Sequence, residues 1–319
     1  MGLGELLAQN LGSPAVLAFV LGAVAVRLKS DLSFPESVTS LLSTYLLLSI
    51  GFKGGLHLRH AAIADLLWPL IATLAIGVIT PVITYVVARR ILTRGPADSA
   101  ALAAHYGSVS AVTFTAAETF ARNAGTLDER YLAALVAALE VPGIIVALLI
   151  ASRVLGQRTL RTALHDVITG RSVVLLLGGI VIGLVASEKS AVLVEPLFVG
   201  LFPGVLVLFL LDLGVLAGAR LEALRSAGAK FVAFAIVLPA IFGVLGSFVG
   251  TAAGLSVGGV TVLAAMAASA SYIAAPAAVR IGIPDADAGL ALGAALGITF
   301  PFNLVVGIPL YAELAARLA

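Results

Sequence analysis

Long apolar stretches with almost no charge are the feature that most limits how this chain can fold. Of its 319 residues, 61% are hydrophobic and only 11% are charged, whereas a soluble domain carries about 25% charged residues. The apolar stretches are continuous and do not alternate with polar residues as the strands of a membrane β-barrel do. The sequence therefore predicts an all-α integral membrane protein.

Ten stretches reach, or nearly reach, the roughly 20 residues that a helix needs to cross a bilayer. The sixth stretch is short, and the fourth and ninth are rich in small and polar residues. We expect ten transmembrane helices, at about residues 13–29, 36–56, 66–92, 98–121, 128–152, 171–187, 196–219, 228–253, 258–282 and 286–315.

Lysine and arginine are divided unequally between the two sides of these spans. The loops after the odd-numbered spans hold 13 of them and the opposite side holds five, with Lys53 left in span two. Because basic residues collect in cytoplasmic loops, we expect a multi-pass protein of the inner (cytoplasmic) membrane with both termini outside. The 13 residues are Arg27, Lys29, Arg89, Arg90, Arg94, Arg153, Arg158, Arg161, Arg171, Arg220, Arg225, Lys230 and Arg280.

The two halves of the chain share short motifs in the same order. Residues 50–55, 108–110 and 140–142 align with 213–218, 269–271 and 299–301, respectively. Five spans per half force the second half to enter the membrane inverted, and inverted repeats are typical of secondary transporters. We expect a first repeat at 1–156, a cytoplasmic linker at 157–170 and a second repeat at 171–319.

Polar and small residues interrupt spans four and nine. Gly107 with Ser108 and Ser110 interrupts the fourth, and Ala267–Ser271 with Pro276 interrupts the ninth. The N-terminal ends of broken helices attract anions, and the C-terminal ends offer carbonyls that suit sodium. Small residues that permit close helix packing are the alternative reading. The predicted substrate-binding residues are Gly107, Ser108, Val109, Ser110, Ser269, Ala270 and Ser271.

Two acidic residues lie deep in apolar stretches, Glu140 in LVAALEVPGII and Asp212 in LFLLDLGVL. An intramembrane charge costs at least ~2.5 kcal/mol, so such residues are usually functional or paired. Glu140 is alternatively a packing residue, and Asp212 alternatively lies at a subunit contact. The predicted sodium-binding residues are Ser110, Thr113, Glu140, Asp212, Ser271, Thr299 and Asn303.

Other chemistry finds little support in the sequence. The absence of cysteine excludes thiolate metal sites and disulfides, and we expect no transition metal and no cofactor besides a coupling ion. No HExxH motif is present and no base is placed in sequence to activate a serine, so an enzyme is not expected. A net charge of +2 does not favour nucleic acid. Lys53 either attracts anions or extends to the interface, and His105 is either a substrate contact or a packing residue.

Three motifs resemble those of the sodium-dependent bicarbonate transporters of the SbtA type. They are SIGFKGG at 49–55, HYGSVSAVTF at 105–114 and ASASYIAAPAA at 268–278. The resemblance implies a homotrimer, a core domain of spans three to five and eight to ten, and a gate domain of spans one, two, six and seven. It also implies a PII-like cytoplasmic regulator and a substrate site around Ser108, Ser110, Ser269 and Ser271.

The expected function is sodium-coupled import of bicarbonate by alternating access. Moving one negative charge inward against 100 mV costs about 2.3 kcal/mol, and one co-transported sodium ion cancels that cost. Symport of another small anion such as a carboxylate, and sodium/proton antiport through Glu140 and Asp212, remain alternatives.

Overall fold

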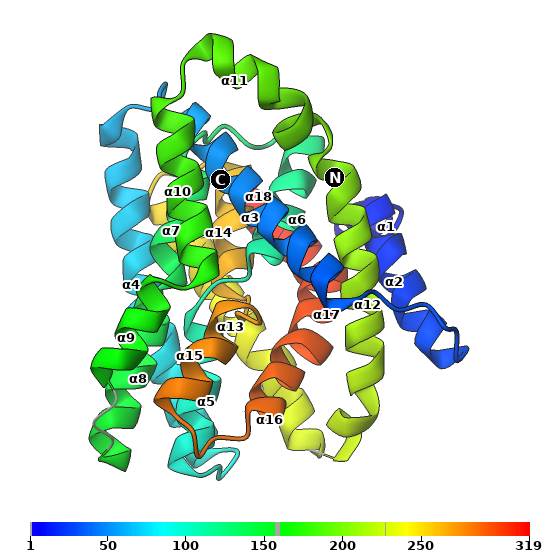
Figure 1. Ribbon diagram of the computed structural model, residues 1–319, viewed down its shortest axis with the longest axis vertical. Helices are drawn as coiled ribbons and strands as arrows, with labels where there is room; N and C mark the ends of the chain where they lie inside the picture. The colour runs from blue at the N-terminus through cyan, green and yellow to red at the C-terminus, as the bar shows by residue number, and fades with distance from the viewer. Residues whose placement is uncertain (1, 157–159, 227) are drawn as a thin grey trace.

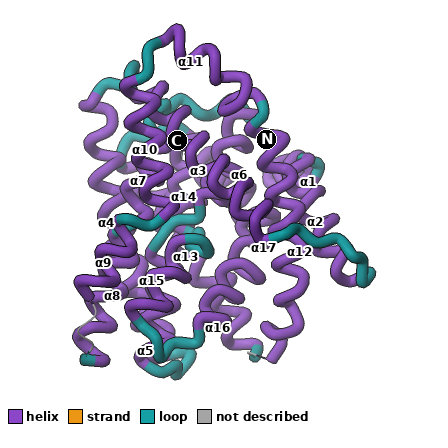
Figure 2. The backbone as a smooth tube through the Cα atoms, in the orientation of Figure 1, coloured by secondary structure: helices purple, strands orange, loops and turns teal. Residues whose placement is uncertain are grey.

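The computed structural model describes residues 2–156, 160–226 and 228–319, and every regular element in these ranges is a helix. Arg158 and the start of the predicted 157–170 linker lie outside the described residues. Figures 1 and 2 show the helices and the short loops that join them. The elements are α1 Leu3–Leu11, α2 Pro14–Arg27, α3 Glu36–Leu58, α4 Ile63–Arg90, α5 Pro96–Gly107, α6 Ala111–Asn123, α7 Leu132–Glu140, α8 Pro142–Leu155, α9 Leu160–Ile168, α10 Arg171–Val185, α11 Glu188–Glu195, α12 Phe202–Ser226, α13 Ala229–Ala252, α14 Val257–Ala267, α15 Ala274–Gly282, α16 Ala288–Gly293, α17 Phe300–Phe302 and α18 Ile308–Leu318, with π-helical turns η1 Pro196–Gly200, η2 Ala294–Thr299 and η3 Asn303–Gly307.

Six helices in the described residues are long and apolar enough to cross a membrane, and α1 with α2, bent by 64°, makes a possible seventh. The all-α prediction is thus confirmed. The expected spans 98–121 and 258–282 are each divided into two shorter helices with non-helical residues between them, whereas α7 with α8 (Leu132–Leu155) and the last helix (Gly289–Leu318) each run on as one span. The expected span 171–187 is the 15-residue α10. The number of ten spans stays a prediction.

Glycines bring two pairs of helices into close contact. A Cβ atom on Gly51 or Gly55 of α3 would collide with the backbone of α10 near Gly179 and Gly183. Likewise, a Cβ on Gly22 of α2 would collide with α12. Small residues four apart permit such approach between membrane helices. Each pair joins a helix from the first half of the chain to one from the second.

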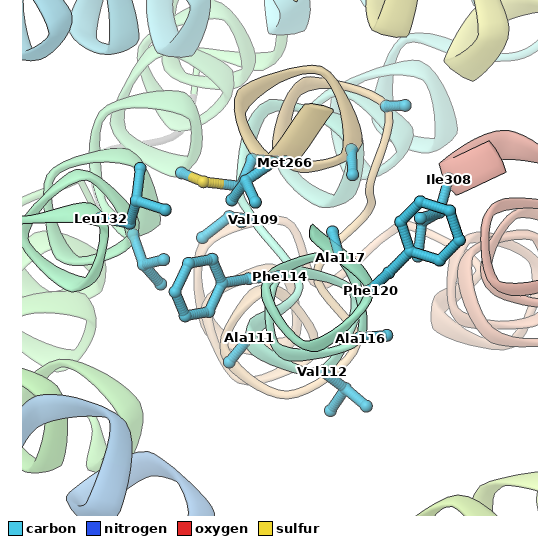
Figure 3. Packing of buried hydrophobic residues seen from close by; sticks show 14 of the residues in the cluster. Val109, Ala111, Val112, Phe114, Ala116, Ala117, Phe120, Leu132, Met266 and Ile308 are labelled. Atoms are coloured by element: carbon cyan, nitrogen blue, oxygen red, sulfur yellow. The ribbon is translucent and has the colours of Figure 1, made fainter. Parts of the chain in front are cut away.

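Helices α5 and α14 occupy the centre of the molecule. Every residue of 99–107 in α5 and of 258–267 in α14 is buried. Helices α4 and α8 pack against α5, while α13 and α18 pack against α14. Figure 3 shows α6 beside α14 and α18, with Phe114 of α6 near Met266 of α14 and Phe120 of α6 near Ile308 of α18. Both central helices are therefore covered by other helices.

Candidate functional site

The interruptions of the two central helices lie against one another. Helix α5 ends at Gly107 and α6 begins at Ala111, whereas α14 ends at Ala267 and α15 begins at Ala274. The Ser110 amide donates a hydrogen bond to Ser269 Oγ (2.9 Å), and the Ser271 amide donates to the His105 carbonyl (2.7 Å). The structure thus brings together all the residues predicted to bind the substrate.

The first interruption is fastened to the joint between α7 and α8. The backbone of Gly143 packs so closely on Gly107 that a Cβ atom at Gly143 would collide with the Gly107 carbonyl. The Ser108 hydroxyl donates to the carbonyl of Glu140 (2.8 Å), where Pro142, which has no N–H, removes a helical hydrogen bond between α7 and α8. Gly107 therefore has a packing role in the structure, in addition to its predicted place in the site.

The second interruption is fastened to the last helix at a π-helical turn. The Asn303 side-chain amide donates to the Ala268 carbonyl (2.7 Å), and Asn303 Oδ1 accepts from the Tyr311 hydroxyl (3.0 Å). Asn303 begins η3 and Thr299 ends η2. Such π-turns occur often at functional sites because they disturb the helical hydrogen-bond pattern.

Ser110 and Ser271 differ from the other two serines in how their hydroxyls are used. Ser110 Oγ accepts from the Thr113 amide (3.2 Å) and Ser271 Oγ from the Ala275 amide (3.3 Å). In the hydrogen bonds of the described residues neither hydroxyl is the donor, so each keeps a proton to donate and a lone pair. The protons of Ser108 and Ser269 are already given to protein carbonyls.

Several buried polar atoms without a partner belong to residues in or next to these segments. Seven such side-chain atoms occur in the described residues, and four belong to His105 (both ring nitrogens), Tyr272 (hydroxyl) and Glu140 (Oε2). An unpaired buried polar group costs about 1–3 kcal/mol, so such atoms are candidates for contact with a ligand or a water. Tyr272, for which the sequence predicts no role, directly follows Ser271, and its hydroxyl lies beside Ser110.

Three other predicted sodium ligands have different surroundings. The Thr299 hydroxyl donates to the Ala235 carbonyl (2.7 Å) and bonds to the Tyr106 hydroxyl (2.7 Å). Glu140 is buried beside the Ser172 side chain. Asp212 accepts a hydrogen bond from the Thr39 hydroxyl (2.7 Å) of α3 rather than from a residue of either interruption.

A cavity of about 390 Å³, here called the inner cavity, borders the second interruption. Tyr272 and Ile273 line it, as do Thr39, Ser43 and Asp212. Glu36, Arg171 and Arg220, which belong to helix ends predicted to be cytoplasmic, line it as well. It is completed by Phe34, Ser40, Phe209, Leu213, Leu216, Leu292 and Leu296. The inner cavity therefore connects the interrupted α14–α15 segment with one face of the molecule.

On the opposite side, a water-sized gap of about 10 Å³ lies among Lys53, His57, Glu118 and Arg122. Lys53 Nζ lies 4.3 Å from the centre of the Phe202 ring, and Arg122 forms an ion pair with Glu118 (2.7 Å). Neither interruption contributes a residue to the lining of this gap.

These features define an α-helical membrane protein whose buried polar groups gather where two interrupted helices meet. The chain belongs to the Na⁺-dependent bicarbonate transporter superfamily, whose family model matches residues 14–316. The resemblance drawn from the three sequence motifs is thereby confirmed. No individual curated protein matches the chain.

Proposed function

We propose that the protein is a symporter that imports bicarbonate together with sodium by alternating access. Membership of the superfamily supports sodium-dependent bicarbonate transport. The observation that carries the proposal further is the meeting of the two interruptions, because it offers opposite kinds of helix end at one buried point. The protein acts as a transporter rather than an enzyme and needs no cofactor besides the coupling ion.

The anion binds between the starts of α6 and α15. The first N–H groups of a helix have no partner within it and carry partial positive charge. Ser110 and Ser271 add two hydroxyl protons at these positions. Bicarbonate accepts such bonds through its oxygens, and a site without a lysine or arginine releases the ion again easily. Gly107, Ser108, Val109, Ser269 and Ala270 are the other members of the proposed site.

Sodium binds beside the anion, at the carbonyl ends of α5 and α14. Hard cations prefer oxygen ligands, and the free lone pairs of Ser110, Ser271 and Asn303 lie near these ends. Thr113, Glu140 and Thr299 belong to the same predicted set. The ion adds positive charge where the anion sits, so sodium binds first and completes the anion site.

The helix contacts support the inverted repeat. Exchanging the halves of the chain pairs span one with six, two with seven, three with eight and four with nine. Under this exchange the α3–α10 contact becomes the α12–α2 contact, and the α4–α5 contact becomes the α13–α14 contact. All four contacts are extensive. They fit a division into a core domain and a gate domain. Four further expectations stay predictions: the homotrimer, the PII-like regulator, the inner-membrane location and the outer position of both termini.

Uptake of labelled bicarbonate into proteoliposomes, with and without an inward sodium gradient, tests the proposal. We expect sodium-dependent uptake by the wild type and a loss of about tenfold or more in Ser110→Ala and Ser271→Ala. Ser247→Ala is the matched control, because Ser247 is equally buried but its hydroxyl donates to the Gly243 carbonyl of its own helix. Absence of sodium-dependent uptake by folded wild type would contradict the proposal, and proton flux without an anion would show antiport instead.

A further inference from the structure

Asp212 carries a buried carboxylate outside the site at the interruptions. Its side chain is 2% exposed on α12, and one oxygen accepts the Thr39 hydroxyl (2.7 Å). The ion pairs of the described residues are Arg122–Glu118 and Arg317–Glu313, so no described basic side chain pairs with Asp212. A buried carboxylate with so little compensation is costly, and such residues within membrane helices commonly lie on ion or substrate pathways.

A second, independent observation lies one helical turn away. Ser43 follows Thr39 by four residues on α3, which places both on the same face of the helix. Ser43 is 4% exposed, and its hydroxyl is one of the buried atoms that have no partner in the described residues. Asp212, Thr39 and Ser43 all line the inner cavity.

The basic residues of the inner cavity stand further along the helices. Arg220 follows Asp212 by eight residues on α12, a distance of about 12 Å along a helix axis. The Arg171 guanidinium donates to Ser40 Oγ, and Glu36 stands at the first turn of α3. The carboxylate of Asp212 is therefore the deeper charge, and the two arginines with Glu36 surround the end of the cavity nearer the helix termini.

We propose that the Asp212 carboxylate and the hydroxyls of Ser43 and Thr39 form a second sodium site, which the coupling ion occupies on its way to the cytoplasm. These are hard oxygen donors, and a single carboxylate balances one monovalent charge. Water in the inner cavity supplies the remaining ligands, so the ion is held loosely enough to leave. The proposal rests on the proposed function for the direction of transport, but the site itself is independent of bicarbonate.

Equilibrium binding of ²²Na⁺ to the purified full chain, measured without bicarbonate, tests this site. We expect Asp212→Asn to lose one class of bound sodium and Ser43→Ala to weaken that class by about fivefold or more. Ser49→Ala is the matched control: Ser49 is also buried on α3 with an unpartnered hydroxyl, but it does not line the inner cavity. We expect it to bind sodium as the wild type does.

The outcomes separate this inference from the proposed function. Unchanged sodium binding in both folded variants would overturn the site, even if bicarbonate uptake is sodium-dependent. A variant Asp212→Asn that binds sodium normally but alters the pH dependence of uptake would assign Asp212 to proton transfer and would also overturn it. If Asp212→Asn does not fold, sodium binding by Ser43→Ala alone decides whether the second sodium site exists. Failure of wild-type bicarbonate uptake with these binding results intact would reject only the proposed function.

Discussion

The backbone of Gly143 lies directly against the carbonyl of Gly107. Adding a single methyl group at position 143 therefore tests this contact. A Cβ atom at position 143 would overlap the Gly107 backbone, which no side-chain rotation relieves. We expect Gly143→Ala to destabilise the protein by at least about 1–3 kcal/mol, the usual cost of overpacking a core. Thermal unfolding in detergent measures it.

Gly178→Ala provides the control for that substitution. Gly178 is also a helical glycine, on α10, but a Cβ atom there would meet no neighbour within 4 Å. Alanine favours a helix over glycine by up to about 1 kcal/mol, so the control should unfold at the wild-type temperature or slightly above it. Equal behaviour of the two variants would show that α5 and α8 are not packed in this way.

Individual site residues were predictable where their chemistry is visible in the chain. Ser110 and Ser271 stand out because serines recur at matching positions in two apolar stretches. Tyr272 was missed because an aromatic residue in an apolar stretch looks like ordinary packing, and only the fold shows its hydroxyl buried without a described partner. Asp212 was placed with the other sodium ligands, and only its bond to Thr39 separates it from them.

At the scale of elements, Glu129 fastens the start of α14 to the loop after α6. One of its carboxylate oxygens accepts the Ser256 amide (2.6 Å) and the other accepts the Ser256 hydroxyl (2.7 Å). Gly259 leaves room for this carboxylate, since a Cβ atom there would overlap it. An acidic group is also favourable at a helix N-terminus. We expect Glu129→Ala to cost about 1–3 kcal/mol, because it leaves the Ser256 amide unpaired, although the Ser256 hydroxyl can still donate to the Thr126 carbonyl (3.1 Å).

Glu313→Ala is the comparison for Glu129→Ala. Glu313 forms an ion pair with Arg317 on α18, where the arginine side chain is 73% exposed, and such surface pairs contribute only about 0.3–0.5 kcal/mol. Both substitutions replace a glutamate with alanine and so remove the same side chain and the same charge. If Glu313→Ala lowers the unfolding temperature as much as Glu129→Ala does, the carboxylate of Glu129 is not what holds α14 to the loop.

Helices were predictable to the extent that length and hydropathy determine them. The stretches 36–56, 66–92 and 228–253 correspond closely to α3, α4 and α13. The bend between α1 and α2 was not expected, because α1 lies in a stretch that contains Glu5, Gln9 and Asn10. The π-turns η2 and η3 were not predicted either, because they depend on hydrogen bonds within the folded helix rather than on apolar periodicity.

At the scale of the whole molecule, the distribution of basic residues and the position of the inner cavity together predict which side of the membrane the cavity opens to. The cavity runs from the interrupted segment at Tyr272 to the helix ends at Arg171 and Arg220, which the charge asymmetry assigns to the cytoplasm. The chain has no cysteine, so a single introduced thiol reports on one position alone. Leu216, which is 37% exposed on the cavity wall, is a suitable position.

We expect Leu216→Cys to react with a membrane-impermeant maleimide added to the cytoplasmic side only, and Ser190→Cys, on the exposed α11, to react only from outside. Sodium and bicarbonate together should slow the reaction of Leu216→Cys by about twofold or more, because alternating access closes the inner cavity when the loaded core domain moves. Sodium alone should have a smaller effect. Labelling from the outer side would reverse the orientation, whereas a rate independent of both ions would separate the inner cavity from the transport path.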